Sequence, residues 1–94
     1  TGLPDSFASG VISGQCLEHC MNPFTLVKEI FRICKKGGYV LLTAPWTFQI
    51  HRYPLDCWRI LPDGMEVLIK FAGGIFVKSY TIDRDCWGIA VITR

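Results

Sequence analysis

The sequence has few charged residues and no long apolar run. Only 19% of its 94 residues are Asp, Glu, Lys or Arg, whereas 50% are hydrophobic. No apolar stretch approaches the roughly 18 residues that a membrane-spanning helix needs, and no secretory signal is recognisable. The formal net charge of +2 is too small to favour a nucleic acid or an anionic membrane surface. We therefore expect neither a membrane nor a nucleic acid as a partner.

The cysteines also lack the even, regular spacing of a disulfide framework. Their odd count of five indicates a reduced protein, which we expect in the cytoplasm. Cys16, His19 and Cys20 suggest a metal site, but a second ligand pair is lacking and zinc usually takes four ligands. His51 and Cys57 would complete such a site only by a coincidence of folding. We therefore expect no bound metal.

Hydrophobic periodicity predicts a strand followed by a helix in the first part of the chain. Residues 7–13 suit a short buried strand, and residues 15–20 suit one helical turn. Asn22 is a good N-cap, Pro23 fits the first helical position, and apolar residues then recur at three- and four-residue steps. We expect Gly37-Gly38 to close this helix through a left-handed glycine, after about fourteen residues.

The rest of the chain completes an α/β pattern. The continuous apolar run of residues 39–44 predicts a strand buried on both faces, as in a parallel sheet flanked by helices. A long aromatic loop follows, and then a helix from Pro62 to a stop at Gly73-Gly74. Two further strands should form an antiparallel hairpin, at residues 75–82 and 87–93. The predicted order is β-α-β-loop-α-β-β with a C-terminal antiparallel hairpin.

Three stretches of this order carry recognisable motifs. Residues 11–20 read V-I-S-G-Q-C-L-E-H-C, a strand followed by an L-E-H segment. Residues 29–38 are similar to an E-x-x-R-x-L-K-P-G-G helix ending, with Lys36 where proline is usual, and residues 51–59 are similar to an H-x-Y-P-x-D-x-W-R loop. Together they resemble the second half of the class I, Rossmann-like, S-adenosylmethionine-dependent methyltransferases, in the branch known as methyltransferase type 11.

The resemblance implies a partial Rossmann-like methyltransferase sheet. Residues 1–94 would be the C-terminal half of the domain, equivalent to the family's strands four to seven. The family's acidic-x-G-x-G-x-G turn and the acidic residue that accepts from the cofactor's ribose have no counterpart in these residues. We therefore expect the N-terminal cofactor-binding half to be absent here. S-adenosylmethionine is implied as the cofactor of the intact parent, and the fragment alone should be inactive.

The family's pattern also implies which residues would line the cofactor pocket. By position these are Ser13, Gly14 and Gln15, with Leu17 behind them. Gly14 permits a close backbone approach, and Gln15 offers both a donor and an acceptor. The alternative is a simple turn from strand to helix.

The loop after residues 39–44 is the best candidate for binding the substrate, because ligands of open α/β sheets bind beyond the carboxyl ends of the strands. Its aromatic residues could stack a planar acceptor, and its arginines could pair with a carboxylate or phosphate. The alternative is a structural cap in which Asp56 and Arg59 pair with each other. Glu18-His19 could likewise supply a general base or be structural. The predicted substrate-side residues are His19, His51, Arg52, Tyr53, Asp56, Trp58 and Arg59.

Two functions remain open at this point. The chain is either part of a methyltransferase that acts on a small molecule or another unknown acceptor, or a non-catalytic remnant that serves as a binding or self-assembly module. Methyl transfer needs few catalytic side chains, because the methyl donor is already activated. The sequence therefore contains no pattern that would identify the catalytic residues, and they are unknown. In the remnant, the strand at residues 7–13 would become an exposed apolar sheet edge. We therefore expect a homo-oligomer.

Overall fold

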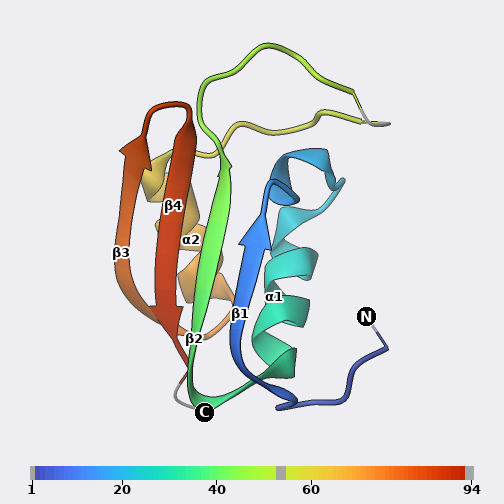
Figure 1. The fold of residues 1–94 in the computed structure, drawn as a ribbon, viewed down its shortest axis with the longest axis vertical. Coiled ribbons are helices and arrows are strands. Elements are labelled where there is room, and N and C mark those ends of the chain that lie inside the picture. The colour runs from blue at the N-terminus through green and yellow to red at the C-terminus, as the bar shows by residue number, and fades with distance from the viewer. Residues whose placement is uncertain (1, 53–54, 93–94) are drawn as a thin grey trace.

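Strands and helices alternate along the chain in the predicted order (Figure 1). The computed structural model describes residues 2–52 and 55–92. Within these ranges, no helix is both long and apolar enough to cross a membrane. The elements are β1 (Ala8–Gly14), the short 3₁₀ helix η1 (Leu17–His19), α1 (Pro23–Ile33), β2 (Cys34–Pro45), α2 (Pro62–Phe71), β3 (Ile75–Ile82) and β4 (Asp85–Val91).

The strands form one mixed sheet in the order β1-β2-β4-β3. β1 and β2 run parallel, with Val11 opposite Val40. β4 inserts between β2 and β3 and runs antiparallel to both, so that Ala90 lies opposite Val40 on one side and Phe76 on the other. The predicted α/β fold with its C-terminal antiparallel hairpin is confirmed, although β4 begins at Asp85, two residues earlier than expected.

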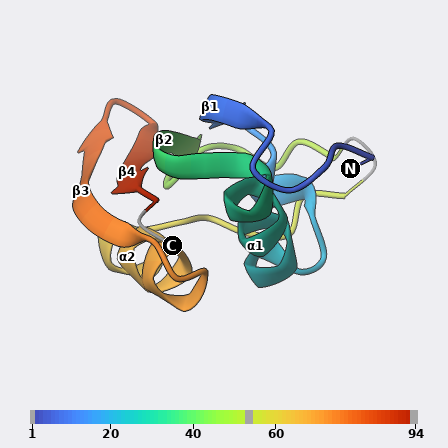
Figure 2. The same cartoon turned by 90° about the horizontal axis from the view of Figure 1, so that it is seen from below.

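Both α-helices lie on the same face of the sheet (Figure 2). The core fills the space between them and the strands, and burial of each large apolar side chain there stabilises the fold by about 1.5–3 kcal/mol. Its fully buried members include residues of both helices and of the two central strands: Val27 and Phe31, Val40 and Leu42, Met65 and Ile69, Cys86 and Ala90.

The opposite face of the sheet carries no helix from the described ranges (Figure 2). Ile12 is 70% exposed and Tyr39 is 58% exposed, whereas Val40 and Leu42 are fully buried. Successive side chains of a strand point to opposite faces, so β2 buries one face and exposes part of the other. The prediction that residues 39–44 are buried on both faces holds at Thr43 and Ala44 but is wrong at Tyr39, which is exposed, and at Leu41, which is half-buried, because that face lacks a covering layer there.

The helix starts follow the sequence signals. The side chain of Asn22 accepts a hydrogen bond from the backbone N–H of Thr25 at 3.2 Å, which caps α1 as predicted. α2 begins at Pro62, and Gly73 takes a positive φ of 91° after its last turn. Glycine adopts this left-handed conformation without a Cβ penalty, so the predicted stop of α2 is confirmed.

The predicted end of α1 is wrong. The helix ends at Ile33 after 11 residues, and Gly37-Gly38 lies inside β2. Gly37 does have a positive φ of 81°, but its N–H donates to the carbonyl of Ile92 at 2.6 Å, beyond the end of β4. A Cβ on Gly38 would lie 2.6 Å from the backbone oxygen of Ser9. These glycines therefore serve close contacts between strands.

Candidate functional site

A cavity of about 360 Å³ opens beyond the carboxyl ends of β1 and β2. In open α/β sheets this is the edge where ligands bind. The long loop after β2 passes over the same edge (Figure 1). The lining comes from the turn after β1, the start of the long loop and the β3–β4 turn: Gln15, Pro45, Phe48, His51, Asp83, Arg84 and Asp85.

Gln15, in the turn after β1, forms hydrogen bonds with β2 and β4 at this edge. Its backbone has a positive φ of 57°, and its N–H donates to the carbonyl oxygen of Thr43 at 3.0 Å. The side-chain amide donates to the Oδ1 atom of Asp85 at 3.0 Å. Gln15 thus fixes the turn after β1 against β2 and against the start of β4, at the rim of the cavity.

The other predicted cofactor residues flank Gln15. Gly14 is exposed at the end of β1, and Ser13 is half-buried before it. Leu17 is fully buried in the core, behind this turn as predicted. The contact of Ser13, Gly14 and Gln15 with a cofactor stays a prediction.

Asp56 organises the long loop. Its buried carboxylate accepts hydrogen bonds from both terminal nitrogens of Arg59, at 2.6 and 2.9 Å, and from the backbone N–H of His51 at 2.7 Å. The guanidinium of Arg59, followed by the His51 N–H, holds the pKa of Asp56 well below its usual range. The pairing of Asp56 with Arg59 that the structural alternative requires is therefore present.

Two further predicted substrate-side residues, Trp58 and Arg52, do not line this cavity, and Trp58 instead lines a separate cavity of about 240 Å³ with Asp56 and Arg59. Trp58 is partly exposed and donates from its indole Nε1 to the carbonyl of Cys20 at 2.8 Å, whereas Arg52 is exposed. Tyr53 lies outside the described residues. Phe48 and Arg84 line the cavity but were not predicted as site residues. The centre of the Arg84 guanidinium lies 4.8 Å from the Phe48 ring centroid, so the two side chains contact each other. Their only sequence signals were an aromatic-rich loop and a turn at the expected hairpin.

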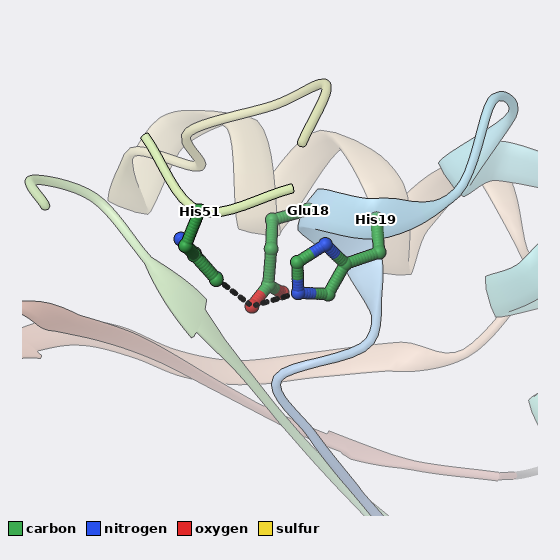
Figure 3. Close-up of side chains that lie close together, drawn as sticks. All are labelled: Glu18, His19 and His51. Carbon is green, nitrogen blue, oxygen red and sulfur yellow. Dashed lines mark ion pairs between the residues drawn. The ribbon is translucent and has the colours of Figure 1, made fainter. Parts of the chain in front are cut away.

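Glu18, His19 and His51 form a compact cluster beside the cavity (Figure 3). The Nε2 atoms of His19 and His51 lie 3.6 and 3.7 Å from the Oε2 atom of Glu18. The long loop reaches this point because the backbone N–H groups of Cys57 and Trp58 donate to the carbonyl oxygen of Glu18. The sequence did not predict that Glu18 and His51 would meet.

Comparisons with known proteins agree with this architecture. Residues 1–42 match the model of a methyltransferase domain family. A protein from Haloferax volcanii, described as a methyltransferase and bound to the Trm112 methyltransferase activator, superposes on 100% of this chain and 58% of its own, with a TM-score of 0.83 and 14% identity. A SAM-dependent methyltransferase from Aquifex aeolicus superposes on 99% of this chain and 50% of its own, with a TM-score of 0.72 and 14% identity. The chain therefore shares the fold of these solved methyltransferases, and its first 42 residues match the methyltransferase family model.

Two curated methyltransferases are also similar to this chain in sequence. Two chloroplastic 2-methyl-6-phytyl-1,4-hydroquinone methyltransferases, from Spinacia oleracea and Arabidopsis thaliana, are 28% identical over 71 and 76 residues. The matches cover 73% and 79% of this chain but only 21% and 22% of those proteins. The cyclase SpnF shares the fold with a TM-score of 0.81 and 12% identity, over 99% of this chain and 53% of its own. The methyltransferase fold alone therefore does not define the reaction.

Proposed function

We propose that the protein transfers a methyl group from S-adenosylmethionine to an acceptor, and that residues 1–94 form the C-terminal half of the methyltransferase domain. The observation that carries the proposal is the cavity beyond the carboxyl ends of β1 and β2, with Gln15 at its rim. This is the sheet edge at which a doubly wound fold binds its ligand.

The donor set at this edge suits such a cofactor. Gly14 is exposed, so the backbone of a ligand-binding turn can be approached closely there. Gln15 uses its side-chain N–H groups within the protein, while its amide oxygen accepts no hydrogen bond from the described residues and can accept one from a ligand. When bound, S-adenosylmethionine supplies an activated methyl group. The task of this chain is then to hold the acceptor in line with that methyl group, which itself lowers the barrier.

The half-domain assignment is supported by the coverage and by the open sheet face. The whole chain superposes on the Haloferax protein, but on only 58% of that protein's length. Exposed apolar residues line the face that lacks helices, including Ile12, Tyr39 and Ile75. A remaining half that packs there would bury them and bring further cofactor contacts.

Calorimetric titration with S-adenosylhomocysteine tests this proposal. A chain extended by the coding sequence upstream of Thr1 should bind with a Kd on the order of micromolar, or about −8 kcal/mol. Residues 1–94 alone should bind far more weakly. If the extended chain does not bind S-adenosylhomocysteine, the methyltransferase proposal is refuted. Micromolar binding by residues 1–94 alone would refute only the half-domain assignment.

The second candidate function is self-assembly through the edge of the sheet. Among the described residues, β1 pairs only with β2, so its outer side offers free backbone hydrogen-bonding groups. Such an edge invites pairing with another chain. Sedimentation velocity of the 94-residue chain should show dimers or larger species at tens of micromolar, an order of magnitude at which weak association becomes visible. A clean monomer at that concentration would eliminate this candidate.

A further inference from the structure

The carboxylate of Glu18 is buried without a counter-charge at hydrogen-bonding distance. Its side chain is 0% exposed, and neither oxygen has a hydrogen-bond partner among the described residues. Burying an ionised carboxylate without compensation is very costly. A cationic partner would therefore stabilise a carboxylate in this position.

Two imidazoles face this carboxylate, but neither bonds to it directly. The Nε2 atoms of His19 and His51 lie 3.6 and 3.7 Å from Oε2 of Glu18, longer than a hydrogen bond (Figure 3). The two rings stand edge to face, with their centroids 4.7 Å apart. Each histidine side chain is 23% exposed, so the cluster is open to a solute on the side away from Glu18.

The other ring nitrogen of each histidine is held by an acceptor. Nδ1 of His19 lies 2.5 Å from the carbonyl oxygen of Leu55, and Nδ1 of His51 lies 3.2 Å from Oδ2 of Asp56. Because both neighbours are acceptors, each Nδ1 carries the hydrogen in the neutral ring, and the lone pair is on Nε2. Metal-binding histidines are oriented in this way, with the outer N–H donated to a carbonyl or carboxylate.

We propose that Glu18, His19 and His51 bind a divalent transition-metal ion such as Zn²⁺. One ligand atom from each residue lies within 4.8 Å of the other two. A tetrahedral zinc site with bonds of about 2.0–2.1 Å has ligand separations near 3.3 Å, so the three side chains would draw closer together around the bound ion. Two histidines and one carboxylate leave a coordination position open. His51 also lines the cavity at the carboxyl ends of β1 and β2, so that position lies next to this cavity.

The metal proposal goes beyond methyl transfer and does not depend on it. It replaces the expectation from sequence that no metal is bound. The sequence suggested a site in which cysteines would join His19 and His51. The fold instead brings the carboxylate of Glu18, in η1, to these two imidazoles.

Titration with Co²⁺, followed by its visible absorption, and with Zn²⁺, followed by calorimetry, tests the proposal on the 94-residue chain. We expect one ion to bind per chain, and the melting temperature to rise with metal concentration. Glu18→Gln and His51→Gln should each abolish binding. Asp56→Asn should weaken it about 10- to 100-fold, because it removes an outer partner of His51.

The matched controls are Cys16→Ser, Cys20→Ser and Cys57→Ser, which remove the alternative thiol ligands near the cluster. These variants should bind as the unchanged chain does. Without metal, Glu18→Gln should be at least as stable as the unchanged chain, because it removes a buried charge, so its loss of binding cannot be ascribed to unfolding. The absence of stoichiometric binding, or loss of binding in a cysteine variant but not in Glu18→Gln, would overturn the proposal.

Discussion

Arg59 donates a hydrogen bond from each of its terminal nitrogens to the buried carboxylate of Asp56, at 2.6 and 2.9 Å. One of these nitrogens also donates to the backbone carbonyl of Gln49 at 3.0 Å. Since Asp56 in turn accepts from the N–H of His51, this ion pair connects Gln49 and His51 with Asp56 and Arg59 across the long loop. A planar, two-pronged contact of this kind cannot be replaced by a lysine.

Arg59→Lys should therefore destabilise the loop and lower the melting temperature of the chain. The variant keeps the charge but loses the two parallel hydrogen bonds to Asp56. Arg52→Lys is the matched control, because Arg52 is an exposed residue of the same loop. Thermal unfolding followed by circular dichroism should show a clearly lower melting temperature for Arg59→Lys and almost no change for Arg52→Lys. If both substitutions lower the melting temperature equally, the role given to Asp56 is contradicted.

A second ion pair makes the stability of the chain depend on pH. The guanidinium of Arg32, at 2.7 Å from Oε1 of Glu29, lowers the pKa of that carboxyl to about 2. Because this value is below that of the unfolded chain, the pair contributes stability above about pH 4.5, which is lost as the pH falls toward 2. Glu29→Gln should thus lower the melting temperature at pH 7, and its difference from the unchanged chain should shrink on acidification. A difference that stays constant down to pH 2 would contradict this assignment.

The contact between α2 and β4 requires a glycine. A Cβ placed on Gly88 would lie 2.2 Å from Cγ of Met65 and 3.1 Å from Cδ1 of Ile69. Gly88→Ala should therefore lower the free energy of unfolding by about 1–3 kcal/mol through overpacking. Gly64→Ala is the control, since its Cβ would meet only Cγ2 of Ile60 at 3.8 Å. In urea unfolding we expect Gly64→Ala to be neutral or stabilising, and a neutral Gly88→Ala would show that α2 packs less closely than the structure indicates.

The exposed edge strand provides a test of self-assembly. Ile12 projects from β1 on the uncovered face and is 70% exposed. Ile12→Lys adds a charge that natural edge strands use to prevent pairing, so it should shift the sedimentation profile toward the monomer. Lys78→Arg, on the other edge strand, should leave the profile unchanged. If Ile12→Lys assembles like the unchanged chain, β1 is not the contact.

The elements with strong local signals were predictable from the sequence, and those that depend on tertiary contacts were not. The strand at Ile75–Ile82 matches its predicted bounds because apolar and β-branched residues fill it between a glycine pair and a turn. Gly37-Gly38 carried an equally strong local signal for a helix end, yet its hydrogen bonds with Ile92 place it in β2. The sequence did not contain that partner's position.

The candidate site shows the same division. The resemblance to the methyltransferase family implied that Gln15 lines a pocket after the first strand, and the structure puts Gln15 at the rim of the cavity. The meeting of Glu18 with His51 depends on how the long loop folds back, which is set by hydrogen bonds from Cys57 and Trp58 to a backbone carbonyl. No spacing within the sequence encodes such a contact.

The most direct test of the methyltransferase assignment is the binding of S-adenosylhomocysteine to the chain extended by its upstream coding sequence, measured for the unchanged protein and for Gln15→Ala. The side-chain amide of Gln15 donates to Oδ1 of Asp85 at 3.0 Å and to Oγ1 of Thr43 at 3.5 Å, so its removal should weaken binding about tenfold or more, or roughly 1.4 kcal/mol. Lys78→Ala, on β3, should have no effect. We predict micromolar binding that depends on Gln15. An extended chain that does not bind, or that binds equally well without the Gln15 side chain, would contradict the proposed site.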